Sequence, residues 1–458
     1  IGPWGAPWLP ATRKGTQLFD VSGYIGGIER TIDEKSVAGG HFVLASDGDV
    51  RMNGGSSVDL SGGTVTYRAG TVGYSVVRSA DGRSQSVEDA KADRIYTGVA
   101  DRTRTVASMV EGRDAGRMDV SASGMVLDGR ITATRTIGLT QRELGTRWVA
   151  PGVSQTVGVP QAGQLLLTLT NGDAPQNLRF VNGTASRTVS ATSPLPDELW
   201  LRSDLFAGGG IGVFSLQGAG RVTLPQDVTL DIGPTARRDA VSGKWTDGSL
   251  FDLHATAFDI DGTITAAGGD VKLTTDAPDE GLRLSERSVR FGQQASISTA
   301  GRWMRDTRDG APQYLAYDGG SVTVDARGNL VFPDGARIDV SAGGGRTLDG
   351  KVHLGDAGSI ALLAGSRLTS ASGESGTLGD YFGTLTLGGA LGGYGVSWLD
   401  RSGGSGSLAL RSARIAYDGQ TSGQRDGTLY LSDALFTQYG FDDFTIDGGN
   451  GVTIGRAD

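Results

Sequence analysis

Residues 319–345 read GGSVTVDARGNLVFPDGARIDVSAGGG, and this stretch decides the fold. It contains three short runs in which apolar and polar residues alternate, Ser321–Asp325, Asn329–Phe332 and Ala336–Val340. Each run is closed by Gly, by Pro-Asp-Gly or by a Gly cluster. Alternation at period 2 between such turn residues predicts half-buried β-strands. Because strands this short cannot each carry a core, the units must stack on one another.

The same phrase, an Asp between two apolar residues followed by Ser or Gly, recurs along the chain. It is centred on Asp20, Asp59, Asp119, Asp231 and Asp339, and in looser form on Asp259. Three of the spacings are close to two, three and four times a unit of about 20 residues, and two others do not fit. A coil of roughly 20 residues with insertions is therefore expected, in the range typical of solenoids. We therefore expect an all-β fold, a right-handed parallel β-helix with loop and hairpin excursions. About 20 coils would give a rod of roughly 100 Å. A β-sandwich or barrel is the alternative.

A second repeat indicates that one supersecondary unit is used twice. Leu205-Phe206, Phe214-Ser215-Leu216 and Val222-Thr223-Leu224 each match a similar phrase 230 positions later, without a gap. The later phrases are Leu435-Phe436, Phe444-Thr445-Ile446 and Val452-Thr453-Ile454.

Composition excludes several classes of protein. Gly accounts for 75 of 458 residues without a period of three, which excludes collagen, and 13 Pro residues argue against Pro-rich disorder. A hydrophobic content of 38% suits the thin interior of a solenoid coil. No apolar run is long enough to cross a membrane, so we expect no membrane insertion. The net charge of −9 argues against a nucleic-acid or anionic-membrane partner.

Metal and cofactor sites are not expected. The chain has no cysteine, and its three histidines are scattered, so neither a disulfide nor a zinc site is predicted. Gly448–Ile454 resembles half of a calcium-binding β-roll repeat, but Thr453 stands where the ligand Asp should be and the phrase occurs once.

The pattern divides the chain into four parts. Residues 1–18 form an irregular N-terminal segment or cap, and residues 19–136 form the first part of the β-helix. A polar excursion at about 71–113 is expected to be a long loop with one short helix. Residues 137–196 form an irregular insertion with a hairpin made of Gln155–Pro160 and Gly163–Thr170. Residues 197–458 form the second part of the β-helix, with loops at about 304–317 and 370–382, and Pro196–Trp200 is expected to open a short helix.

The first residues, Ile1-Gly-Pro-Trp, show neither Met nor a signal peptide, and the last ones fall within a strand pattern. We therefore expect the sequence to be a piece of a longer polypeptide.

Several phrases resemble the filamentous-haemagglutinin-type large exoproteins that Gram-negative bacteria export by two-partner secretion. These phrases are Val58–Gly70, Asp81–Arg83 with Tyr96–Ala100, Leu205–Gly210, Ser298–Met304, Ala336–Gly344 and Leu391–Gly395 before Gly406–Leu410. The resemblance spans about residues 19–454. It implies a secreted β-helical rod at the bacterial cell surface, associated with the outer membrane. It also implies export through an outer-membrane transporter partner, and a role in adhesion, aggregation or biofilm formation.

Carboxylates need separate consideration because parallel β-helices also include polysaccharide lyases and hydrolases. Asp442-Asp443 and Asp279-Glu280 are the candidate pairs, since a glycosidase needs two carboxyls about 5–10 Å apart. Neighbouring strand residues point to opposite faces, which argues against the first pair. We expect no catalytic residues and assign a structural role to the recurring Asp residues.

Tryptophans in irregular segments are the candidates for sugar contact. Trp303, Trp245 and Trp398 are the expected glycan-contacting aromatics, although such residues also seal loops against a fold. The expected function is a non-enzymatic adhesive shaft that binds host or bacterial surface glycans or receptors, with lateral self-association as a further expectation. A carbohydrate-active β-helix enzyme and a passive stalk that presents a domain outside this sequence are the alternatives.

Overall fold

The computed structural model describes residues 15–16, 19–20 and 37–455. Gaps fall at 88–89, 92, 139–140, 142–144, 151–152, 158, 172–174, 186, 188, 190–192, 234, 239–244, 277–282, 306–316, 347–351, 370–373, 400 and 420–421. Strands make up 54% of the residues and helices 4%, so the fold is all-β, as predicted.

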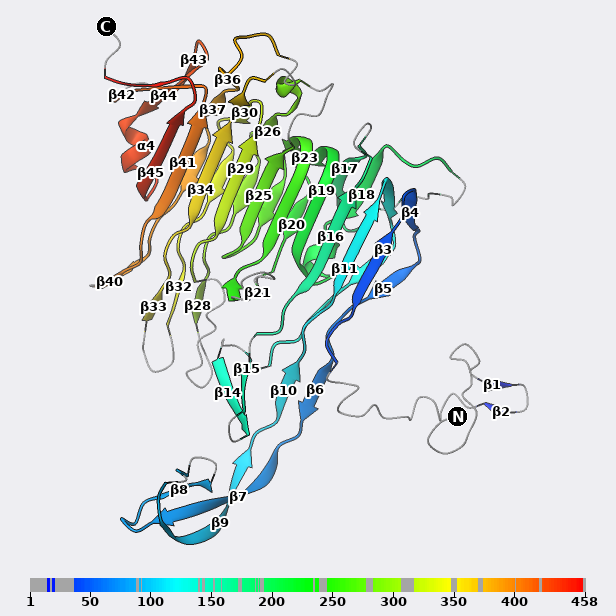
Figure 1. Cartoon of the computed structure of the whole chain (residues 1–458), viewed down its shortest axis with the longest axis vertical. Coiled ribbons are helices and arrows are strands. Elements are labelled where there is room, and N and C mark those ends of the chain that lie inside the picture. Colours follow the sequence, from blue (N-terminus) through cyan, green and yellow to red (C-terminus); the bar gives the residue numbers. More distant parts are fainter. Residues whose placement is uncertain are drawn as a thin grey trace.

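A long parallel sheet, here called the first ladder, runs through the molecule (Figure 1). Every neighbouring pair along it is parallel. In order, its ten strands are β3 (His41–Ala45), β11 (Arg117–Ala122), β16 (Gly163–Leu169), β19 (Ile211–Leu224), β23 (Leu250–Ile260), β25 (Asp270–Thr275), β29 (Ser321–Ala326), β34 (Ser359–Ala364), β41 (Gly406–Ser412) and β45 (Phe441–Gly448).

Two further sets of parallel strands accompany the first ladder. The second ladder contains β18 (Glu198–Arg202), β17 (Asn177–Val181), the second halves of β19 and β23, β26 (Val289–Phe291), β30 (Leu330–Phe332) and β37 (Leu385–Leu387). The third ladder contains β20 (Thr229–Asp231), β24 (Thr263–Thr265), β27 (Ser296–Ser298), β31 (Arg337–Asp339) and β38 (Ala390–Gly392). Near the amino terminus, β4 (Asp49–Met52) pairs with β12 (Gly124–Leu127), and β5 (Ser57–Asp59) with β13 (Arg130–Thr132).

The three runs of residues 319–345 are confirmed as strands. They become β29, β30 and β31, which contribute one strand to each ladder. Alternation decides which side chains face inward: in β29, Val322 and Val324 are fully buried while Ser321 and Thr323 are only half-buried.

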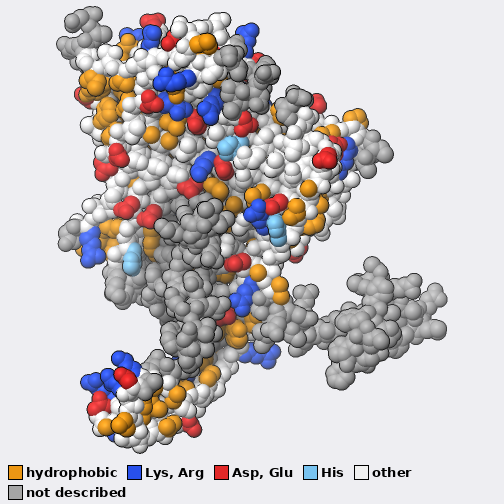
Figure 2. Space-filling view, in the orientation of Figure 1, with side chains coloured by type: hydrophobic (Ala, Val, Ile, Leu, Met, Phe, Trp, Pro, Cys, Tyr) orange, Lys and Arg blue, Asp and Glu red, His pale blue; other side chains and the backbone are white. Residues whose placement is uncertain are grey.

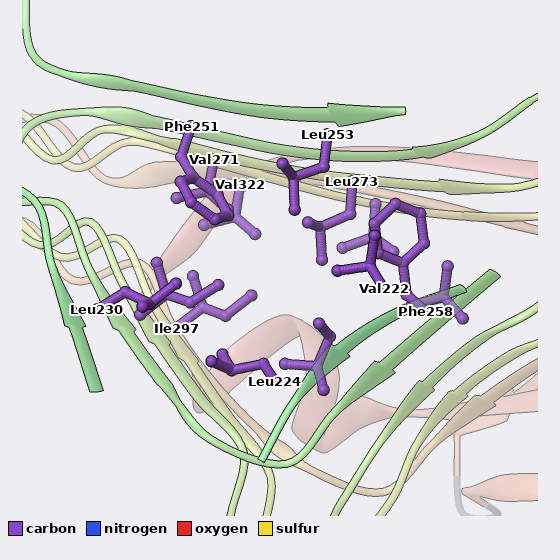
Figure 3. Packing of buried hydrophobic residues seen from close by; sticks show 14 of the residues in the cluster. Val222, Leu224, Leu230, Phe251, Leu253, Phe258, Val271, Leu273, Ile297 and Val322 are labelled. Carbon is purple, nitrogen blue, oxygen red and sulfur yellow. The ribbon is translucent and has the colours of Figure 1, made fainter. Parts of the chain in front are cut away.

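The core lies between the three ladders. Figure 3 shows Phe251 and Val271 of the first ladder pointing toward Leu230 and Ile297 of the third, while Phe258 of the second ladder lies beside Val222 at the right of the view. All five belong to one continuous cluster of buried apolar side chains that runs through the ladders. Each pass of the chain therefore adds a thin apolar slice that its neighbours cover.

Most passes are longer than the expected unit of about 20 residues, because they contain insertions. Leu250 and Asp270 pair at a separation of 20, but other neighbouring passes are separated by up to 76, as between His41 and Arg117. Excursions at the corners account for the extra residues. The first ladder therefore has ten strands, and at about 4.8 Å per strand it is roughly 45 Å long, not 100 Å.

The excursion expected as a loop with a helix is instead an antiparallel sheet. Strands β7 (Gly70–Ser79), β8 (Ser84–Ser86) and β9 (Tyr96–Val106) form it, and β6 (Thr64–Tyr67) paired with β10 (Met109–Gly112) joins it to the body (Figure 1). Every residue of β9 from Thr97 to Thr105 is exposed. A strand with two solvated faces has no apolar alternation, which is why the sequence did not predict it.

The insertion at 137–196 is smaller than expected. The hairpin consists of β14 (Gly145–Ala150) and β15 (Val153–Val157), whereas Gly163–Leu169 forms β16 within the first ladder. The expected helix at Pro196–Trp200 is wrong as well, because residues 198–202 form strand β18. The helix starts later, as α3 (Asp204–Ala207).

The repeat at a spacing of 230 residues corresponds to one unit of structure used twice. In the first copy β18, α3 and β19 follow one another. The second copy has the same order, namely β44 (Thr428–Ser432), α4 (Asp433–Thr437), β45 and β46 (Val452–Ile454). The pairings match too: β17 lies between β18 and β19, and β42 (Arg414–Gly419) lies between β44 and β46. Both copies place a T-shaped ring pair at the helix, Phe206–Phe214 at 5.5 Å and Phe436–Phe444 at 4.9 Å between centroids.

Candidate functional site

Three successive passes extend beyond the stack at the same corner, between the third ladder and the next strand of the first ladder. The extensions contain β28 (Trp303–Arg305), β32 (Gly344–Arg346) with β33 (Val352–Leu354), and β39 (Ser397–Trp398) with β40 (Arg401–Ser402). β28 pairs with β32 in parallel, and β32 pairs with β33. In Figure 1 these strands lie together below the ladders.

The extensions bring together two of the tryptophans that the sequence singled out. The rings of Trp303 and Trp398 stack with centroids 5.8 Å apart and an interplanar angle of 28°. The residues remain 44% and 39% exposed, respectively. Both stacked rings still meet solvent, and the exposed face of an indole ring suits the CH-rich face of a sugar ring.

A second aromatic pair lies in the same extension. Tyr317 and His353 stack with centroids 6.3 Å apart and an interplanar angle of 7°. Glycines lie beneath the rings: a Cβ on Gly345 would come within 2.6 Å of the Tyr317 hydroxyl, and one on Gly344 within 2.7 Å of the Trp303 ring. The Gly cluster that ends residues 319–345 therefore makes room for the aromatic side chains.

A groove of about 700 Å³ runs across the starts of five strands of the first ladder, and Tyr317 lines it. Gly and Ser residues line most of it, together with four carboxylates. The lining side chains are Tyr317, Ser321, Ser359, Ser405, Ser407, Asp270, Asp318, Asp442 and Asp443. Hydroxyls, carboxylates and one aromatic ring in an open groove can bind the hydroxyls of a chain of sugars.

Hydrogen bonds fix part of the groove wall. The Asp270 carboxylate accepts a bond of 2.5 Å from the Ser321 hydroxyl, and Asp318 accepts one of 2.9 Å from the amide of Asp356. Asp356 in turn accepts a bond of 2.6 Å from the amide of Gly404. These carboxylates link one pass to the next, and their charge makes the groove unfavourable for polyanions.

The carboxylates Asp442 and Asp443 were expected on opposite faces of a strand, and this is wrong. Both are exposed and both line the groove. Their strand has a β-bulge at Asp442, because Gly406 pairs with Phe441 and Ser407 pairs with Asp443. The first copy of the repeat has the same bulge at Gly212. The other candidate pair, Asp279-Glu280, lies outside the described residues.

The recurring Asp residues serve two structural purposes. Asp59 and Asp339 each accept a hydrogen bond from an amide two residues on, Ser61 and Ser341, as in an Asx turn. The bonds from Ser61 lower the pKa of Asp59. Asp119 instead bonds side chains. Its burial raises its pKa, but the bonds from Arg117 and His41 outweigh this effect and lower it. The side chain of Asp20 lies outside the described ones.

Sequence reasoning found part of this site. Trp303 and Trp398 were candidates, but their pairing was not predicted, and Trp245 lies in β22 (Trp245–Asp247) with its side chain outside the described ones. Tyr317 and His353 were missed because neither belongs to a recognisable motif. The Gly pair at 344–345 is the only signal that could have indicated rings packed on backbone.

Neither metal ligands nor membrane spans are found in the described part of the chain. No group of three or more His, Cys, Asp or Glu side chains there could hold a metal ion. None of the described helices has the length and apolar character needed to cross a membrane. In comparisons with protein-family models, curated proteins and solved structures, no match to this chain is found.

Proposed function

We propose that the chain folds as a right-handed parallel β-helix and serves as the shaft segment of a secreted bacterial surface adhesin. The three parallel ladders around one core support the β-helix, since parallel crossovers are right-handed in nearly all proteins. The resemblance to filamentous-haemagglutinin-type exoproteins supports the assignment to an adhesin. Such a segment is exported through an outer-membrane transporter partner and is displayed at the cell surface.

The binding activity that we propose is attachment to neutral surface polysaccharides. The stacked and exposed pair Trp303–Trp398 is the observation that carries this proposal. The neighbouring glycines Gly344 and Gly345 contact Trp303 and Tyr317, and Tyr317 lines the groove. Aromatic rings stack on sugar faces while hydroxyls and carboxylates bond sugar hydroxyls. The four groove carboxylates favour neutral sugars over sulfated ones.

The test is retention of the protein on immobilised neutral polysaccharides, with polymer length measured before and after. Aromatic contacts are worth about 1 kcal/mol beyond their buried area, so Trp303→Ala should weaken retention about fivefold. Ile95→Ala is the matched control, because Ile95 is an exposed apolar side chain immediately before β9.

Three results would contradict the proposal. Shortened polymer would indicate an enzyme that uses groove carboxylates. An absence of retention would favour a passive stalk. Equal loss of retention in the Trp303 and Ile95 variants would show that the stacked tryptophans do not take part in binding.

A further inference from the structure

The first ladder ends in an edge with exposed core positions. β45 pairs with β41 and has no second partner among the described strands, and β46 is at the end of its own sheet. Val452 is 45% and Ile454 is 79% exposed. Figure 2 shows hydrophobic side chains gathered at this end, over α4 and β45.

The internal repeat shows what covers such an edge. In the first copy the residues equivalent to Val452 and Ile454 are Val222 and Leu224, and both are fully buried. The next pass of the chain covers them: Val222 pairs with Phe258 and Leu224 pairs with Ile260, both in β23.

Strand β23 also fills the ring cluster beside the helix. Phe251 pairs with Phe214, and its ring lies 5.8 Å from Phe206 and 5.5 Å from Phe214 between centroids. The equivalent rings of the second copy, Phe436 and Phe444, are only half-buried.

The opposite end of the stack contains strands whose sequence resembles β23, the strand that covers the equivalent edge in the first copy. β3 reads HFVLA, with Phe42 and Leu44 at the positions that Phe251 and Leu253 occupy in β23. β4 continues with the inward residues Val50 and Met52, as β23 does with Phe258 and Ile260. Phe42 is 36% exposed, and β3 pairs only with β11 among the described strands.

We propose that two copies of this chain associate head to tail, with β3 and β4 of one copy pairing in parallel with β45 and β46 of the next. The register of β23 on β19 places Phe42 opposite Phe444 and Leu44 opposite Ile446. It also places His41, which bonds Asp119 of its own chain, opposite Asp443, so that a base faces a second acid across the junction. Such a contact is heterologous and does not close, so it produces a filament in which the core runs through the junction.

Engineered disulfides test the register directly, because the chain has no cysteine. In the variant Val43→Cys/Thr445→Cys the two thiols face each other across the junction. Neighbouring strands lie about 4.8 Å apart, within the roughly 4.4–6.8 Å between Cα atoms that a disulfide spans. Oxidation should give a series of covalent oligomers on a non-reducing gel.

The matched control is Val43→Cys/Thr437→Cys, which puts the second thiol on α4 at the same end but off the strand edge. Docking raises the effective concentration of the Thr445 thiol, so this pair should cross-link about tenfold more than the control. Equal yields would show random collision and overturn the proposal.

Sedimentation velocity of the full chain provides the second measurement. The wild-type protein should form larger species as its concentration rises, and Ile454→Lys should return it to the monomer. Val99→Lys, at a position in β9 that is 70% exposed, should leave assembly unchanged. A wild-type protein that stays monomeric at every concentration would overturn the proposal. Neither readout involves a polysaccharide, so failure here is separate from failure of the glycan-binding function.

Discussion

At the residue scale, glycines set how closely successive passes approach each other along the groove. A Cβ on Gly320 would lie 1.8 Å from the carbonyl oxygen of Gly269, and one on Gly358 would lie 1.8 Å from that of Gly320. A Cβ on Gly406 would be 2.7 Å from the oxygen of Gly358. Real Cβ contacts are never this short, so each position requires glycine for close approach of two backbones.

Gly358→Ala should therefore destabilise the stack. The backbone atoms that the new methyl group meets belong to the strand pairing, because Ser359 donates from its amide to the Gly320 oxygen at 3.3 Å. Overpacking of this kind costs about 1–3 kcal/mol, and we expect the upper end because backbone cannot move aside. The urea midpoint of unfolding measures the effect.

Gly98→Ala is the control for this prediction. Gly98 lies in β9, and a Cβ added there would have nothing within 4 Å. The urea midpoint of the Gly98→Ala variant should therefore stay the same or rise slightly. Equal losses of stability in the two variants would show that close approach of the backbones does not explain the glycine at position 358.

At the element scale, what could be predicted depends on whether a strand buries one face. β29, β30 and β31 were predicted because their inward residues alternate with polar ones against the core. β9 was missed because both its faces are exposed, and β18 was taken for a helix because its pattern followed a proline. β16 was placed in a hairpin because period 2 is the same in parallel and antiparallel strands.

The β7–β9 sheet should be dispensable for the fold of the ladders. It joins the body through the antiparallel pair β6–β10, which ends where Tyr67 pairs with Met109. Replacing residues 68–108 by Asn-Gly, the preferred two-residue hairpin turn, keeps that pairing. We expect an unchanged urea midpoint for the ladders and unchanged retention on polysaccharide.

The matched control shortens a pass inside the stack instead. Removing residues 327–329 between β29 and β30 changes the register of fully buried side chains, so it should abolish folding. A loss of the ladders after removal of the β7–β9 sheet would show that the sheet is needed for the body to fold.

At the scale of the whole molecule, the candidate site arises from three separate passes. Trp303 and Trp398 are 95 positions apart and come together because their passes leave the stack at one corner. Sequence alone indicated both tryptophans, but the lengths of the excursions, which decide where the corners fall, follow no fixed period. For the same reason the number of passes was overestimated.

Stacked passes also predict how stability varies along the molecule. Each pass is stabilised by its neighbours, so those in the middle gain two interfaces and those at the ends gain one. The inward side chains of Val271 in β25 and Val322 in β29 are fully buried, whereas Phe42 in β3 is 36% exposed and Ile454 in β46 is 79% exposed. Amide hydrogen exchange should therefore be slowest in β25 and β29 and should quicken toward β3 and β46.

Head-to-tail association adds the missing interface to both ends at once, so raising the protein concentration should slow exchange in β3 and in β45–β46 together while leaving β29 unchanged. Slower exchange at one end alone would mean that the two edges do not bind each other, and uniform protection at low concentration would mean that the ladders unfold as a single unit.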